Sequence, residues 1–395
     1  MSAKRVAFAA LLCLGAVLGW PGQARADEPG AGRRPSMSEL VQGQAERLDD
    51  GEFQRLLDQV SRDAGGYAPR IDWREAVSQV SAGREGIDVR GLARGVATYL
   101  FRETVANTRL LGKLIILAVA VALLEKMGSS FDSRGVSELA SSACHLALVV
   151  VAAGSFAYSV AVARDLIAGM VRMMNAVLPT LIALIAASGA PVTAGLLQPV
   201  MVATVYAVSA VTSDYVLVLL TLAAVLDIVG HVVRPFNVSG LAALLRQASM
   251  LVMGLCLAAF LGVVAVNRVA GAVADGIALR SAKFLSGTFV PVVGKMFADA
   301  IEMVFASSYI LRNAVGIAGA AAVVTAAAFP LCKIVSLVAV YRIAAALVQP
   351  VGAETLSDCL NGIASSLTGI SVAAGSVAVM FVVAVATLAV AARPP

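Results

Sequence analysis

Residues 365–392 read SSLTGISVAAGSVAVMFVVAVATLAVAA, 28 consecutive positions without a charged side chain. A helix of about 20 apolar residues is long enough to cross the roughly 30 Å hydrocarbon core of a membrane. Similar apolar runs occupy most of the chain beyond residue 109. The sequence therefore predicts an all-α fold, a polytopic integral membrane helical bundle, because apolar runs of this length are typical of transmembrane helices.

The apolar runs divide into about 7–9 expected hydrophobic spans. Several are close to the minimum length of about 17–20 residues. The runs around Pro179 and Pro199 are separated only by residues 188–191, which predicts a hairpin or a re-entrant pair. The expected spans lie at residues 110–126, 143–163, 173–190, 195–212, 215–233, 247–266, 313–332, 333–351 and 365–392.

The charged residues are concentrated toward the N-terminus. The whole chain is 59% hydrophobic and 14% charged, whereas soluble domains carry about 25% charged residues. Residues 27–109 hold 26 charged side chains, and the much longer segment 110–395 holds another 26. This change in density predicts two parts, a small helical extracytoplasmic arm at 27–109 and a multi-span membrane domain at 110–395.

The first 26 residues have the pattern of a secretory signal peptide. Lys4 and Arg5 precede an apolar stretch, and residues 24–26 (ARA) fit a cleavage site with small residues. We expect cleavage of residues 1–26, which places the arm outside the cytoplasm and the loop 231–247, with Arg246, inside it. An uncleaved first anchor is the alternative. Without the three basic residues of this segment the formal charge falls from +5 to +2, and no nucleic-acid partner is expected.

The segment 267–312 carries polar faces between apolar spans. A first helix places four charged residues on one face and a second helix places three, with Gly287 and Pro291 between them, which predicts an amphipathic hairpin. We interpret this hairpin as a candidate pore lining or interface, with a solvated loop as the alternative.

Charges inside apolar helices are functional candidates, and Arg342 and Asp227 are of this kind. For Arg342, snorkelling or pairing with an acid of the bundle is the alternative. The candidate pore or interface residues are Arg268, Asp275, Arg280, Lys283, Pro291, Lys295, Asp299, Glu302 and Arg342.

Signatures of catalysis and of metal or cofactor binding are missing from the sequence. The two histidines, His145 and His231, have no metal-ligand spacing, and neither a Walker A motif nor a dinucleotide-binding glycine pattern occurs. The five cysteines include no Cys-x-x-Cys pair, which favours buried thiols over a disulfide framework. We therefore expect no enzyme activity, no metal and no cofactor.

Two weak internal similarities occur at different offsets. Residues 156–164 (FAYSVAVAR) resemble 260–268 (FLGVVAVNR) at an offset of 104, whereas 196–200 (LLQPV) resemble 347–351 (LVQPV) at an offset of 151. Because the offsets disagree, they do not define one repeat, and an alanine- and valine-rich chain produces chance similarity. A genuine repeat with proline-interrupted helices would be typical of a transporter.

The longest ordered blocks of the sequence resemble a known family. Residues 267–284 (NRVAGAVADGIALRSAKF) and 287–299 (GTFVPVVGKMFAD) are similar to the signature region of the stage III sporulation protein AE family. The resemblance runs from about residue 50 to the end, and its blocks keep their order and spacing. Further blocks lie at 65–69 (GGYAP), 99–103 (YLFRE), 110–113 (LLGK), 313–319 (NAVGIAG) and 347–351 (LVQPV).

The resemblance implies a role in endospore development. It implies a multi-pass protein of the mother-cell-derived membrane around the forespore. There the protein would belong to a channel or secretion-like complex with the other stage III A sporulation proteins and stage II protein Q, energised by a dedicated ATPase. A homo-oligomer fits this interpretation. The alternatives are a small-molecule transporter (permease) and a passive membrane scaffold for the complex.

Overall fold

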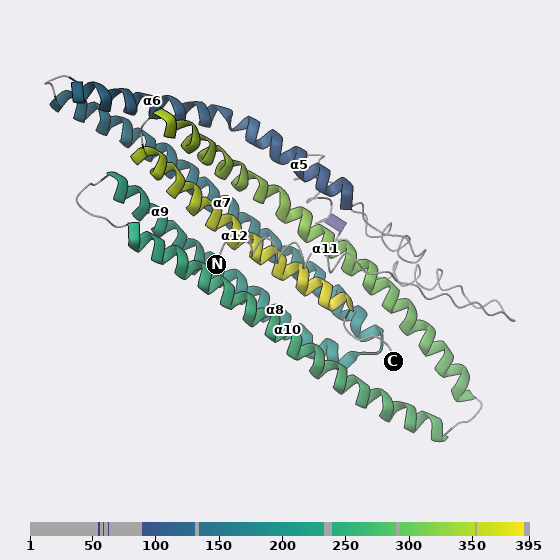
Figure 1. Cartoon of the computed structure of the whole chain (residues 1–395). Coiled ribbons are helices and arrows are strands. Elements are labelled where there is room, and N and C mark those ends of the chain that lie inside the picture. The colour runs from purple at the N-terminus through teal and green to yellow at the C-terminus, as the bar shows by residue number, and fades with distance from the viewer. Residues whose placement is uncertain are drawn as a thin grey trace.

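The structure, a computed structural model (Figure 1), describes a helical bundle and four residues of the preceding arm. In this part of the chain every regular element is a helix and no strand occurs, which confirms the all-α membrane bundle. The expected signal peptide at 1–26 and most of the arm lie outside the described residues. The described residues are 54, 55, 58, 62, 89–130, 134–232, 239–289, 293–351 and 354–390.

The described helices form three consecutive antiparallel hairpins. The first contains α5 (Val89–Ala106), α6 (Thr108–Ser130) and α7 (Arg134–Ala187). The second contains α8 (Pro191–Ala210), the π-helix η1 (Val211–Val216), α9 (Leu217–Val232) and α10 (Ser239–Phe289). The third contains α11 (Val293–Val348), the short 3-10 helix η2 (Gln349–Val351) and α12 (Glu354–Val390).

The three hairpins are nearly equal in length. Counted between the bounds above, they have 99, 99 and 98 residues, and three residues separate each hairpin from the next. The helix ends that face each other within a hairpin lie at one end of the bundle, and the helix ends where one hairpin follows another lie at the other end (Figure 1).

This arrangement places one of the two internal similarities in equivalent helices. Residues 156–164 lie in α7 and residues 260–268 lie in α10, which are the second helices of the first and second hairpins. Both segments begin with a buried phenylalanine and end with an exposed arginine. The offset of 151 relates the start of the first arm of the second hairpin, in α8, to the end of the first arm of the third hairpin, in α11 and η2, and these positions are not equivalent.

The membrane-spanning helices are fewer and longer than the expected 7–9 spans. Five of the described helices are long and apolar enough to cross a membrane, or six if the bent pair α5–α6 forms one span. The expected spans 143–163 and 173–190 fall largely in α7, and 313–332 and 333–351 fall largely in α11. The reason is that a charged residue interrupts an apolar run without interrupting the backbone hydrogen bonds of the helix.

Prolines inside the helices do not end them. Pro179 lies within α7, Pro199 within α8 and Pro330 within α11. A proline removes one backbone donor and crowds the carbonyl one turn earlier. At membrane depth, neighbouring helices can compensate for the backbone group that is left without its hydrogen bond. The chain turns instead at residues 188–190, where Gly189 has φ +88°. The two helices around this turn, α7 and α8, are long antiparallel helices of adjoining hairpins rather than a re-entrant pair.

Helix α12 lies at the centre of the bundle. It packs most extensively on α11 and also contacts α7, α9 and α10, and its span is the most buried of the five. A Cβ at Gly316 of α11 would collide with Ala389 of α12, and one at Gly319 would lie 3.2 Å from Val177 and 3.3 Å from Val385. Small residues of this kind allow helices in membranes to approach closely and to gain van der Waals contact.

Helix α5 lies along α11 and bends by 42° into α6 at Asn107. Tyr99 packs edge-on against Phe329 with ring centroids 5.0 Å apart, a favourable aromatic geometry. The Asn107 amide donates a hydrogen bond of 3.1 Å to the Ser336 hydroxyl. The described end of the arm therefore packs on the membrane domain.

We predict that Asn107→Cys combined with Ser336→Cys forms an intramolecular disulfide in a background without the native cysteines. The two side chains touch in the structure, which brings them within reach of a disulfide. Limited proteolysis between the two positions followed by non-reducing electrophoresis detects the bond. The matched control pairs Asn107→Cys with Val335→Cys, since Val335 is exposed. Equal oxidation of the two pairs would contradict the packing of α5 on α11.

Candidate functional site

Two clusters of buried or partly buried polar side chains lie toward opposite ends of the bundle. Charged and polar groups inside membrane proteins are rare, and those that occur pair with one another or with backbone groups. The turn cluster surrounds the connection between α7 and α8 and contains Ser188, Thr193, Asp275 and Arg312. The ion-pair cluster joins α9, α10 and α12 through Asp227, Arg246 and Ser366.

The carboxylate of Asp275 caps helix α8 from a different helix. It accepts hydrogen bonds from the backbone N–H groups of Val192 (3.0 Å) and Thr193 (3.1 Å) and from the Thr193 hydroxyl. Helix α8 needs this acceptor because its N-cap residue, Ala190, has no polar side chain and Pro191 has no N–H. A negative charge also interacts favourably with the N-terminal end of the helix dipole. Asp275 thereby ties α10 to α8.

Arg312 of α11 is fully buried beside the same turn. Its Nε donates to the carbonyl of Ala389 near the end of α12 (3.0 Å), and a terminal nitrogen donates to the Ser188 hydroxyl (3.0 Å). The guanidinium also lies 4.9 Å from the ring centroid of Tyr309, within cation–π range. A cation at the C-terminal end of a helix interacts favourably with its last carbonyls. Arg312 therefore joins α11, α12 and the turn.

Two glycines permit the close approach of helices around the turn. Gly189 has a positive φ that favours glycine, and a Cβ at this position would lie 3.0 Å from the ring of Phe305. A Cβ at Gly271 of α10 would come within 3.1 Å of carbon atoms of Thr193. Helices α10 and α11 therefore pack directly against the turn, with no room for a larger residue at either glycine.

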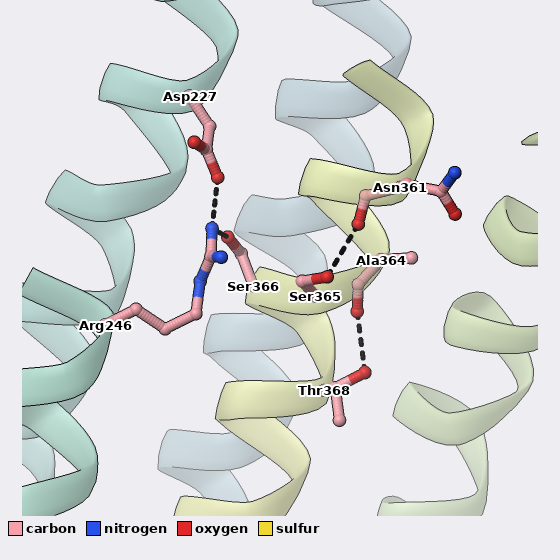
Figure 2. A network of polar contacts seen from close by, with 7 residues as sticks. All are labelled: Asp227, Arg246, Asn361, Ala364, Ser365, Ser366 and Thr368. Atoms are coloured by element: carbon pink, nitrogen blue, oxygen red, sulfur yellow. Dashed lines mark hydrogen bonds and ion pairs between the residues drawn. The ribbon is translucent and has the colours of Figure 1, made fainter. Parts of the chain in front are cut away.

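The ion-pair cluster lies between α9, α10 and α12 (Figure 2). Arg246 forms an ion pair with Asp227, and the same terminal nitrogen donates to the Ser366 hydroxyl at 3.1 Å. A Cβ at Gly362 would lie 3.5 Å from the Asp227 carboxylate, an ordinary van der Waals distance, so the acid lies directly against α12 at this position. The cluster connects the two helices of the second hairpin to the central helix of the third.

Helix α12 carries further hydroxyl groups next to the ion pair. Ser365 donates to the carbonyl of Asn361 (2.8 Å), and Thr368 donates to the carbonyl of Ala364 (2.7 Å), as Figure 2 shows. Each hydroxyl bonds to the backbone of its own helix one turn earlier, a partner that serine and threonine commonly use inside helices. These hydroxyls are therefore satisfied without water.

The structure separates the candidate pore or interface residues. Asp275 is buried in the turn cluster, whereas Arg268 and Arg342 are exposed on α10 and α11. Helix α10 ends at Phe289 and α11 begins at Val293. Pro291 and the side chains of the other candidates lie outside the described part of the chain: Arg280, Lys283, Lys295, Asp299 and Glu302.

Sequence reasoning does not single out the two cations of the clusters. Arg246 is expected in a loop and Arg312 at the edge of the amphipathic hairpin, but both lie inside the bundle. Asp227 pairs with Arg246, which comes 19 residues later in the chain. A signal for Arg312 exists, because it is the one charged residue in the apolar run 303–332.

The fold and the two clusters define a class of protein, a multi-span α-helical membrane protein whose buried charges connect its helices. The described residues contain no group of three or more His, Cys, Asp or Glu side chains placed to hold a metal ion. Comparison with known proteins identifies the family within this class.

The chain belongs to the stage III sporulation protein AE family, whose profile matches residues 71–392. The stage III sporulation protein AE of Bacillus subtilis (strain 168) is 33% identical over 343 residues, which cover 87% of this chain and 86% of the relative. No solved structure matches the chain. The family expected from the sequence blocks is thus confirmed, and the chain is a membrane protein of sporulation.

We predict that Asp227 and Arg246 are energetically coupled. Removing one member of a fully buried pair costs about 3–5 kcal/mol. We expect Asp227→Asn or Arg246→Gln to lower the free energy of unfolding by about 1–3 kcal/mol, less than for a fully buried pair, because the Arg246 side chain is 24% exposed. The free energy of unfolding of the double variant should fall by at least about 1 kcal/mol less than the sum of the decreases in the two single variants. Unfolding of the purified chain in detergent measures these changes.

The exposed Arg342 provides the matched control for this double-mutant cycle. Arg342→Gln should change stability by less than about 0.5 kcal/mol and should add independently to Asp227→Asn. Strict additivity of Asp227→Asn and Arg246→Gln would contradict the coupling.

Proposed function

We propose that this chain is a membrane component of the channel or secretion-like complex between mother cell and forespore. In this proposal it resides in the mother-cell-derived membrane around the forespore and assembles with the other stage III A sporulation proteins and stage II protein Q. Membership of the stage III sporulation protein AE family carries the proposal. The helical membrane bundle supplies the body that such a component needs.

The projecting end of the α10–α11 hairpin is the part that we assign to assembly with partners. Helix α10 continues beyond Asp275 as far as Phe289, and α11 begins at Val293, several turns before Phe305. At 1.5 Å per residue, this end extends about 20 Å past the turn cluster, and Figure 1 shows it beyond the turn between α7 and α8. A hairpin that leaves the body of the bundle offers surface to a partner without disturbing the core.

The turn cluster connects this projecting end to the rest of the bundle. Asp275 of α10 bonds to the first turn of α8, while Arg312 of α11 bonds to Ser188 and to the end of α12. A displacement of the hairpin by a partner would therefore reach α8 and α12 through a few short contacts. Contiguous packed contacts of this kind are a route by which binding at one place affects another.

A small-molecule transporter is the second candidate function. One observation favours it, which is the partly buried ion pair of Asp227 and Arg246 within apolar helices. Charges at such positions mark substrate or ion pathways in many membrane proteins. Uptake of a substrate that depends on both residues would support the transporter, whereas in the channel proposal the pair holds helices together.

We predict that shortening the projecting hairpin blocks sporulation without preventing membrane insertion. Replacing residues 279–301 by a short glycine-rich turn removes the projecting end and retains Asp275 and Phe305 at the turn cluster. Heat-resistant spores, counted in a host whose own copy of the gene is deleted, should fall to the level of the deletion strain. The variant should remain in the membrane fraction at the wild-type level.

Copurification distinguishes a role of the projecting end in assembly of the complex from a role after assembly. The shortened variant should lose the other stage III A proteins on affinity purification, and the wild-type chain should retain them. As a control, the same glycine-rich turn inserted between α9 and α10 should change neither result. Normal spore numbers, or full recovery of the partners with the shortened variant, would contradict the assignment of the hairpin to assembly.

A further inference from the structure

Helices α5 and α6 carry all of their described basic side chains on one outward face. Residues 89–124 contain a single acid, Glu103, which is half-buried, whereas the five cations of the same segment are exposed. At 100° per residue, these cations fall within about 140° of each other around the helix. We call this face the basic ladder, and its cations are Arg90, Arg94, Arg102, Arg109 and Lys113.

The basic ladder continues through the bend between the two helices. The Asn107 N–H donates to the carbonyl of Glu103, and the Asn107 carbonyl accepts a hydrogen bond from the Leu111 N–H, both at 3.1 Å. The helical repeat is therefore kept across the bend. Val96, which packs against Phe329, and the fully buried Leu114 lie about 160° around the helix from the centre of the ladder. The basic ladder thus points away from the bundle.

Two large apolar side chains are exposed between the cations. Phe101 is 73% exposed and Val105 is 55% exposed, and both lie within the arc of the basic ladder. Protein interfaces are enriched in arginine and in aromatic side chains, and residues of these two kinds carry much of the binding energy. The basic ladder therefore has the composition of a surface that binds protein.

The basic ladder does not match a layer of lipid headgroups. Arg90 and Lys113 are separated by about 35 Å along the two helices, and α5 runs along α11. A headgroup layer is only about 5–8 Å thick on each side of the membrane, and the hydrocarbon core does not accommodate exposed charges. A partner that pairs with cations over this whole length is therefore an acidic protein surface of similar length.

The preceding part of the chain contains a segment with these properties. Residues 37–63 hold seven acids and three arginines, a formal charge of 3 − 7 = −4. Apolar positions at helical spacing predict a helix over this segment, which would be about 40 Å long. Most of the segment lies outside the described residues. Its four described residues are helical, and they are Gln54, Arg55, Asp58 and Arg62.

The charges of this predicted helix are sorted by face. Six of its seven acids fall within about 160° around the helix, and the apolar stripe lies inside this arc, whereas the three arginines lie opposite. Of these arginines, Arg55 and Arg62 are described, and both are exposed. The predicted helix thus presents an acidic face with an apolar centre, the complement of the basic ladder. The apolar stripe has the spacing i, i+3, i+4 and i+7 and consists of Phe53, Leu56, Leu57 and Val60, and the six acids are Glu39, Glu46, Asp49, Asp50, Glu52 and Asp63.

We propose that the helix of residues 37–63 docks on the basic ladder of its own chain. Glu52 then meets Arg102 and Phe53 packs beside Phe101, because these residues lie near the middle of the two segments whichever way the docked helix runs. The connection of residues 64–88 can span up to about 80 Å, which suffices for either direction. Docking covers the exposed apolar side chains and neutralises the cations together. It is compatible with a channel component, a transporter or a scaffold and depends on none of them.

Disulfide formation within the chain tests the docking. In the full chain without its native cysteines, Phe53→Cys combined with Phe101→Cys should form an intramolecular disulfide upon mild oxidation in membranes. Cleavage at a protease site inserted at residues 65–69 then yields two fragments that separate only upon reduction. Arg55→Cys combined with Phe101→Cys is the matched control and should stay reduced, since Arg55 lies on the opposite face of the predicted helix.

Three results would overturn the docking. Equal oxidation of the two pairs would show that the acidic face is not directed at the ladder. Absence of a disulfide in both pairs would show that the segment lies elsewhere. A disulfide that joins two chains would show that the arm of a second copy covers the ladder.

Exchange of charge tests the pairing itself. With Phe53→Cys and Phe101→Cys present, Arg102→Glu should slow disulfide formation by about tenfold, the effect of about 1.4 kcal/mol, because two acids then face each other. Adding Glu52→Arg should restore the rate, since it exchanges the two signs. Arg268→Glu, at an exposed arginine of α10, is the matched control and should leave the rate unchanged. An unchanged rate with Arg102→Glu, or no recovery in the exchanged variant, would overturn the pairing.

Discussion

The hydrogen bonds from the first turn of α8 to the Asp275 carboxylate are the contact on which the rest of the arrangement depends. Ala190 at that helix end is buried and offers no side-chain acceptor, so the free N–H groups need a partner from elsewhere in the chain. Asp275 supplies it from α10 and thereby sets the relative height of α8 and α10. Arg312 extends the same constraint to α11 and α12. The three hairpins thus meet around one three-residue turn.

Polar groups give this apolar bundle its register. Packing between helices that are apolar on most faces depends on small residues and van der Waals contact. Such contact brings two helices close together, but it does not fix their relative position along the bundle axis. A buried carboxylate or guanidinium tolerates one arrangement only, because displacement leaves its partners without hydrogen bonds. The turn cluster acts in this way where hairpins join, and Asp227 with Arg246 acts toward the opposite end.

The sequence predicts the fold class and the family, because apolar composition and ordered blocks are local properties. It overestimates the number of spans, since Arg164, Asp214 and Lys333 end apolar runs while the helices continue through them. It identifies Asp275 as a polar residue of an amphipathic helix, but not as the cap of α8, because that contact joins residues 82 apart. Helical periodicity does not predict the burial of Arg312 for the same reason, because its partners come from the turn after α7 and from α12.

Hydrogen exchange at the start of α8 tests the central claim most directly. In the purified full chain, the amides of Val192 and Thr193 should exchange as slowly as amides inside helices, because both donate to Asp275. Asp275→Ala should accelerate their exchange by about tenfold or more, as expected for the loss of a hydrogen bond to a charged group. Rapid exchange in the wild-type chain, or no response to Asp275→Ala, would contradict the account. Apolar packing, and not the hydrogen bonds to Asp275, would then hold the hairpins together.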